Sequence, residues 1–152
     1  MTNYQKLSAE QSVDPDKQIQ CKSVMVPIVA LNNWNPMLVE VFGKPIKKYE
    51  IDRAIATNNL LNEPLSKPST KFRKRRDHIA RIAYMVVNPD TTPIEIDVGI
   101  PCLNYINDWP IVDGHHRLAS TFYRGDTEIS AFISGQISYA AELFNIKEDM
   151  LQ

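Results

Sequence analysis

A short turn in the last third of the chain, Asp113-Gly114-His115-His116-Arg117, combines residue types that could bind and act on an anion. It follows an apolar segment and precedes a helical pattern, so we expect a strand to end and a helix to begin here. A helix N-terminus presents free backbone N–H groups and about half a positive charge. Gly114 would let a ligand approach the backbone, and the Arg117 guanidinium could donate two hydrogen bonds to phosphate oxygens. The histidines could relay a proton. The turn therefore predicts a phosphate site at Gly114, His115, His116 and Arg117, with Asp113, His115 and His116 as candidate catalytic residues.

Some of these residues also have a purely structural interpretation. Asp113 could be the N-cap of the helix, which Gly125 would end. His115 falls on the same helical stripe as three residues that would pack on the sheet, Leu118, Ala119 and Phe122. A packing role is therefore open for His115. His116 and Arg117 point away from that stripe, which favours a binding role for them.

The run from Lys71 to Arg76 is a second candidate feature. Its basic members are Lys71, Arg73, Lys74, Arg75 and Arg76. They could contact nucleic-acid phosphate or line the nucleotide pocket, and the alternative is a solvated loop before a helix. Cations at a helix N-terminus oppose the helix dipole, which favours a negatively charged partner. We favour a role in the nucleotide pocket over DNA contact, because one basic block on a chain of net charge −1 offers little electrostatic attraction for duplex DNA.

No metal site is identified from the sequence. Seven carboxylates could hold Mg²⁺ or act as a base, but their spacing does not single out a pair: Glu40, Glu50, Asp52, Asp77, Asp97, Asp108 and Asp113. His78 lies at the start of a predicted helix and has no partner visible in the sequence. The chain contains no Walker A, HExxH, GxSxG or EF-hand motif.

Composition indicates one globular domain of ordinary size. The chain has 152 residues, of which 43% are hydrophobic, with 17 basic and 18 acidic side chains. Cys21 and Cys102 lie far apart and outside any CxxC motif, so no disulfide framework is predicted. The N-terminus lacks a signal-peptide pattern, and no segment approaches the length of a membrane span. We expect a cytoplasmic protein that does not act at a membrane.

Periodicity predicts an α/β (α+β) fold, with a small mixed sheet and helices in a single compact domain. Residues 1–20 read as a polar leader and residues 21–152 as the domain. Strands are predicted near 24–31, 93–98, 109–112 and 128–133, with a further short strand at 103–107. Helices are predicted near 49–61, 77–87, 114–124 and 137–144. Pro27 favours an edge position or a strand end.

The stretch from Trp109 to Gly135 resembles the ParB/sulfiredoxin superfamily. Members typically show a strand, a Gly-x-x-Arg turn, an Ala-containing helix that ends in Gly, and a further strand. More loosely, residues 24–31 followed by Asn35-Pro36 resemble the family's opening strand. Residues 79–87 followed by 93–96 resemble its helix and second strand. The resemblance implies a ParB/sulfiredoxin-like domain.

Departures from the family pattern limit the functions that the resemblance implies. His115 occupies the position of the catalytic cysteine of sulfiredoxins, so sulfinic-acid reduction by that mechanism is excluded. The turn reads Gly-His-His-Arg where ParB partition proteins carry Gly-(Glu/His)-Arg-Arg, and only a short stretch follows Ser134. A DNA-reading helix-turn-helix is therefore not expected. The Asp-Gly-x-His-Arg form looks closer to free-standing members, which include nucleotide-dependent serine kinases and ParB-like nucleases.

The resemblance thus implies a nucleotide-binding protein that transfers a phosphoryl group or hydrolyses a nucleotide at the turn. ATP, ADP or CTP is the expected ligand, with Mg²⁺ as cofactor. Two alternatives stay open: a non-enzymatic binding module of plasmid, phage or defence origin, and a nuclease that contacts DNA through residues 71–76. The sequence leaves open whether the chain is an enzyme and which oligomer it forms.

Overall fold

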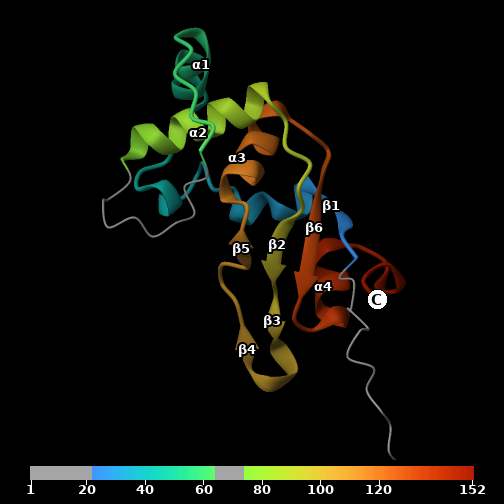
Figure 1. Ribbon diagram of the computed structural model, residues 1–152. Helices are drawn as coiled ribbons and strands as arrows, with labels where there is room; N and C mark the ends of the chain where they lie inside the picture. The colour runs from blue at the N-terminus through green and yellow to red at the C-terminus, as the bar shows by residue number, and fades with distance from the viewer. Residues whose placement is uncertain (1–21, 64–73) are drawn as a thin grey trace, which may run out of the picture.

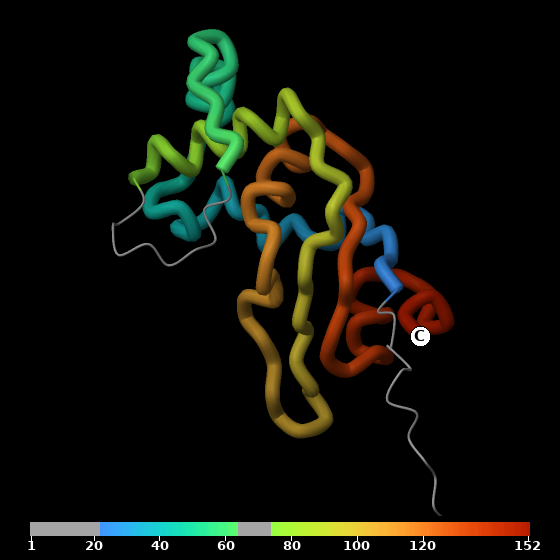
Figure 2. Tube along the Cα trace, viewed as in Figure 1, coloured from blue at the N-terminus to red at the C-terminus, as the bar shows by residue number. Residues whose placement is uncertain are grey.

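The computed structural model describes residues 22–63 and 74–152, which form an α+β fold as the periodicity predicts. A mixed four-stranded sheet has the order β1-β6-β2-β5, and a hairpin of β3 and β4 extends past it (Figure 1). The strands are β1 (Val24–Pro27), β2 (Ile94–Asp97), β3 (Gly99–Ile100), β4 (Tyr105–Ile106), β5 (Ile111–Asp113) and β6 (Glu128–Ser134). β6 pairs antiparallel with β1 and parallel with β2, and β5 pairs antiparallel with β2. Strands from the two ends of the described chain, β1 and β6, therefore lie side by side (Figure 2).

One face of this sheet carries most of the core. Strand alternation and register bring seven buried residues onto that face: Val24, Val26, Ile94, Ile96, Ile111, Ile129 and Ala131. The intervening Met25, Glu95 and Val112 are exposed on the other face. The core face is covered by the 3₁₀ segment η1 (Ile28–Trp34) and by helices α3 (His115–Arg124) and α4 (Ile137–Phe144).

A second, smaller core joins α3 to the remaining helices. Its buried residues come from the segment around η2 (Glu40–Phe42), from α1 (Lys48–Ala56) and from α2 (Arg75–Val87). Helix α3 contributes to both cores, with Leu118 against the sheet and Ala119 against α2. Because α3 is anchored from two sides, its first turn is held in a fixed position between the sheet and α2.

Several predicted boundaries are wrong by a few residues. The first strand ends at Pro27, which pairs with Glu128, and the chain continues as η1 to Trp34. Pro27 lies on an edge strand, as predicted. Helix α1 ends at Ala56 because Asn58 takes a left-handed conformation, φ 53°. Within 103–107 only Tyr105–Ile106 is a strand, since Asn104 makes the hairpin turn.

The remaining elements agree more closely with their predicted ranges. The closing helix α4 has its predicted bounds. Helix α2 begins at Arg75, two residues before its predicted start, and the Asp77 carboxylate accepts a hydrogen bond from the Lys74 N–H at 3.2 Å. A short 3₁₀ segment η3 (Pro101–Leu103) lies in the hairpin and another, η4 (Glu148–Met150), near the end of the chain. The predicted leader, residues 1–20, lies outside the described residues. Among the described helices, none is long and apolar enough to cross a membrane.

Candidate functional site

The Asp-Gly-His-His-Arg turn joins β5 directly to α3. Asp113 is the last residue of β5, and Gly114 is the N-cap of α3 with φ 94°. The prediction that Asp113 caps the helix is therefore wrong. Asp113 pairs with Glu95 in the sheet, and its carboxylate accepts a hydrogen bond from Arg117 at 2.6 Å. Because no side chain caps α3, the first-turn N–H groups have no partner of that kind, which leaves them suited to an anion.

Gly114 is required by packing as well as by backbone conformation. A Cβ at this position would lie 2.4 Å from Cγ2 of Ile94, which is fully buried in the central strand β2. The positive φ also disfavours any residue with a side chain. The absent side chain therefore lets the turn lie directly on the sheet, in addition to the ligand approach expected from the sequence.

A pocket of about 540 Å³ opens at the first turn of α3. Residues 113–117 line one side of it. The other lining residues come from η2, from α2 and from the loop that follows α2: Val41, Phe42, His78, Arg81, Met85, Asp90 and Thr92. The fold thus brings all five residues of the turn to one pocket and adds a second wall that the sequence did not predict.

Two guanidinium groups with little solvent exposure line the pocket, where the carboxylates of Asp90 and Asp113 balance their charge. The Arg117 side chain is 12% exposed, and it donates to the Thr92 carbonyl at 3.2 Å as well as to Asp113. Arg81 is buried on α2 and donates to the carbonyls of Leu61 at 3.3 Å and Asn62 at 2.5 Å. Burial lowers the pKa of Arg81, because the charged form loses solvent. An anionic ligand would restore part of the lost solvation.

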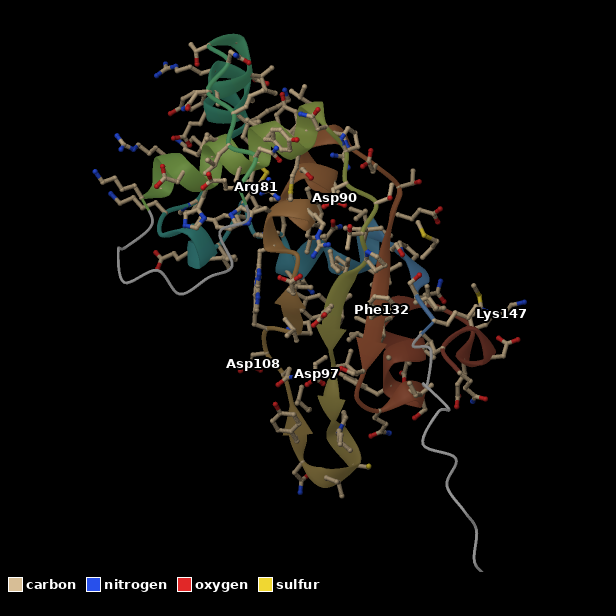
Figure 3. All side chains as sticks on the ribbon, in the orientation of Figure 1. Arg81, Asp90, Asp97, Asp108, Phe132 and Lys147 are labelled. Atoms are coloured by element: carbon tan, nitrogen blue, oxygen red, sulfur yellow. The ribbon has the colours of Figure 1, made fainter. Side chains whose placement is uncertain are left out.

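Asp90 is a carboxylate beside these two guanidinium groups. It lies on the loop after α2, close to Arg81 (Figure 3). The hydrogen bonds from Thr92, and then the charges of Arg117 and Arg81, lower the pKa of Asp90. Asp90 and Asp113 are the carboxylates among the residues that line this pocket.

Two histidines from different helices form a hydrogen-bonded pair in the pocket. His78 Nδ1 on α2 lies 2.9 Å from His116 Nε2 on α3, so one ring must donate and the other must accept. The two histidine rings stack, with centroids 5.2 Å apart. Phe42 stacks on His116 at 4.9 Å and lies tilted against His78 at 5.0 Å. Burial, followed by the nearby His78 and Arg81, lowers the pKa of His116 to about 3. The pair therefore holds His116 neutral and links it to a second nitrogen that can share its proton.

His115 is held by a different contact. The indole Nε1–H of Trp109 donates to His115 Nε2 at 3.0 Å, and the two rings lie parallel. An accepting Nε2 carries no proton, so the neutral His115 ring carries its proton on Nδ1. Burial lowers the pKa of His115, which favours this neutral form. The contact combines a packing role with a defined hydrogen-bonding state.

The sequence did not indicate the second wall of the pocket. His78, Arg81 and Met85 are spaced three and four residues apart on α2, so they share one helix face. That spacing could have identified a polar face directed at a site. Phe42 and Thr92 carry no comparable signal, because Phe42 lies in the short segment η2 and Thr92 in a loop, where periodicity marks no face.

The basic run does not contribute to this pocket through its described members. Lys71 and Arg73 lie outside the described residues. Arg75 binds Glu50 through two hydrogen bonds of 2.5 and 2.6 Å, which ties α2 to α1. Lys74 and Arg76 are exposed, and neither lines the pocket. The run as a nucleic-acid contact stays a prediction.

No cluster of three or more potential metal ligands occurs in the part of the chain that the structure describes. Comparisons of the chain with protein-family models, curated proteins and solved structures give no match.

Proposed function

We propose that the pocket at the α3 turn binds the phosphate groups of a nucleotide. The observation that carries the proposal is the uncapped N-terminus of α3, which opens into a pocket beside the Arg81 and Arg117 guanidiniums. Backbone N–H groups and the helix dipole favour an anion, and each guanidinium can pair with phosphate oxygens. The resemblance of residues 109–135 to ParB/sulfiredoxin proteins supports the same ligand class.

A neighbouring recess could take the rest of a nucleotide. It has a volume of about 370 Å³ and shares Arg81, Met85 and Asp90 with the first pocket. Its further lining includes Asn62, Tyr84 and Asn88. Carboxamide groups and an aromatic ring can contact a nucleobase through hydrogen bonds and stacking. A ligand with a phosphate at one end and a polar ring at the other would therefore fill both.

The chemistry that these residues could support is proton transfer next to a phosphate. His116 is neutral in the unbound pocket, and a phosphate dianion nearby would raise its pKa. The His78–His116 pair could then accept the proton of an attacking hydroxyl or water in phosphoryl transfer or hydrolysis. Asp90 and Asp113 could bind Mg²⁺ together with the ligand's phosphates, and Mg²⁺ would neutralise phosphate charge.

Isothermal titration with ATP, ADP, CTP and pyrophosphate, each with and without Mg²⁺, tests the binding step. Arg117→Ala should weaken binding by about 1.5–3 kcal/mol, the range for a hydrogen bond to a charged group. Arg76→Ala is the matched control, because Arg76 is 73% exposed and lies outside the pocket. Absence of binding at millimolar ligand, or equal losses in the two variants, would contradict the proposal.

Turnover separates an enzyme from a binding module. Release of inorganic phosphate, or phosphate transfer to an added hydroxyl acceptor, should be lost in His116→Asn while nucleotide affinity falls only modestly. If the wild-type protein binds a nucleotide but shows no turnover with any acceptor or with water, the non-enzymatic binding module is the better interpretation.

A further inference from the structure

The β3–β4 hairpin exposes a cluster of large apolar side chains beyond the end of the sheet (Figure 1). Leu103 is 72% exposed, and Ile100, Tyr105 and Ile106 are also exposed. Ile100 and Tyr105 are paired across the strands and share one face of the hairpin, whereas Ile106 lies on the other face. Four exposed large apolar residues within one short hairpin are more than scattered surface hydrophobics, and such apolar surface marks an interaction site. We call these four residues the hairpin tip.

The chain that supports the hairpin tip is acidic. Residues 97–108, which form the hairpin and its base, contain two carboxylates and no lysine, arginine or histidine. These carboxylates, Asp97 and Asp108, flank the base of the hairpin (Figure 3). The hairpin tip is therefore an apolar surface with negative charge at its base, and it suits a partner surface that is apolar with a positive charge at its edge.

A groove of that description occurs on the same chain. It has a volume of about 490 Å³ and lies between the segment before α1 and the later part of α3. Its walls include Leu38, which is 68% exposed, together with Pro45 and Phe122, and Lys47 and Lys48 lie at its edge. Lys48 pairs with Asp52, and Lys47 adds an exposed cation. We call this the Leu38 groove.

We propose that copies of this chain associate head to tail, with the hairpin tip of one copy in the Leu38 groove of the next. The hairpin continues directly from β2 and returns into β5, so the sheet fixes its direction. Figure 1 places it at the end of the molecule opposite α1, away from the segment that forms the groove. Contact between the hairpin tip and the groove therefore requires a second copy.

Charge distinguishes this arrangement from a symmetric dimer. Two hairpins packed together would bring their carboxylates close to one another, and two grooves packed together would do the same for Lys47, since Lys48 is paired with Asp52. Both arrangements place like charges across the interface, whereas tip in groove pairs opposite charges. A head-to-tail contact leads to a ring or an open chain of copies.

The nucleotide pocket and the Leu38 groove share no lining residue, so the proposal does not depend on the proposed function.

Sedimentation velocity over a range of concentrations up to millimolar is the first test. The wild-type full chain should associate with increasing concentration. Leu103→Asp and Leu38→Asp should each raise the dissociation constant at least about tenfold, as expected for a buried apolar anchor. Val29→Asp is the control, since Val29 is 73% exposed and lines neither surface. A monomeric wild type, or an equal effect of Val29→Asp, would overturn the proposal.

A mixing experiment tests the direction of the contact. The Leu103→Asp variant keeps an intact groove, and the Leu38→Asp variant keeps an intact hairpin tip. When the two monomeric variants are mixed in equal amounts, the intact hairpin tip of Leu38→Asp can enter the intact groove of Leu103→Asp. A 1:1 heterodimer should therefore form, and no larger assembly should follow, because the other contact carries both substitutions. If the mixture stays monomeric, the head-to-tail arrangement is wrong, and a symmetric contact or an unrelated partner would have to explain the surface.

Discussion

Gly114→Ala should be more destabilising than the same change at the other end of α3. The alanine would have to adopt φ near 94°, which costs about 1–2 kcal/mol for a residue with a side chain. Its Cβ would also lie 2.4 Å from Ile94 Cγ2 and 2.8 Å from Ile94 Cβ. Ile94 is fully buried in a central strand, so relieving this overlap should cost a further ~1–3 kcal/mol. We expect a total loss of about 2–5 kcal/mol.

Gly125→Ala provides a control with the same backbone strain and no overlap. Gly125 ends α3 with φ 72°, and no other atom would lie within 4 Å of the alanine Cβ. Its loss should therefore be limited to ~1–2 kcal/mol. Urea unfolding measures both variants, and with a slope of about 2 kcal/mol/M the midpoints should differ by about 1 M for each 2 kcal/mol of difference. Equal midpoints would refute the account of Gly114 as a packing requirement against Ile94.

Three further predictions concern ionisable groups. The pKa of His116 in the folded chain lies below its value in the unfolded chain, so the unfolded chain binds more protons between about pH 6.5 and about pH 3. The free energy of unfolding should therefore fall by up to about 1.4 kcal/mol per pH unit as the pH falls through this window. Urea titrations of His116→Asn should lack this dependence on pH. Arg75 lowers the pKa of Glu50 to about 2 from 4.5, so the ion pair stabilises the folded chain above about pH 4.5, and this stabilisation is lost as the pH falls towards 2. Glu50→Gln should lower the free energy of unfolding by about 1–2 kcal/mol at neutral pH and reduce its dependence on pH in acid. Trp109→Phe removes the donor to His115 Nε2, so ¹⁵N chemical shifts should show the His115 proton moving partly from Nδ1 to Nε2, and unchanged shifts would exclude a role for the indole in fixing the tautomer.

The elements that carry the site could be predicted from the sequence because their signals are local. Alternation marks the buried face of β2, and the apolar stripe of α3 follows from the spacing of Leu118, Ala119 and Phe122. Gly125 ends α3 in a left-handed conformation, as glycine after a helical pattern predicts. The residues of the turn were therefore placed correctly at the junction of a strand and a helix.

The state of each residue in that turn depended on neighbours distant in sequence. Asp113 failed as an N-cap because strand pairing with Glu95 holds it in β5, and Gly114 took its place at the start of α3. Arg75, one of the basic residues predicted to contact phosphate, is hydrogen-bonded to Glu50, 25 positions earlier. Neither outcome can be deduced from residue type or local spacing, since each depends on which segment lies opposite.

The second wall of the pocket was decided by tertiary packing alone. The sequence determined that α2 is a helix with His78 and Arg81 on one face, and that α3 begins next to His116. It did not determine that α2 packs on α3 so that His78 lies within hydrogen-bonding distance of His116, 38 positions later. Periodicity specifies which residues share a face, because it reflects the geometry of a single helix. Which faces meet depends on the shapes of both cores at once, and that information becomes available only when the chain is folded.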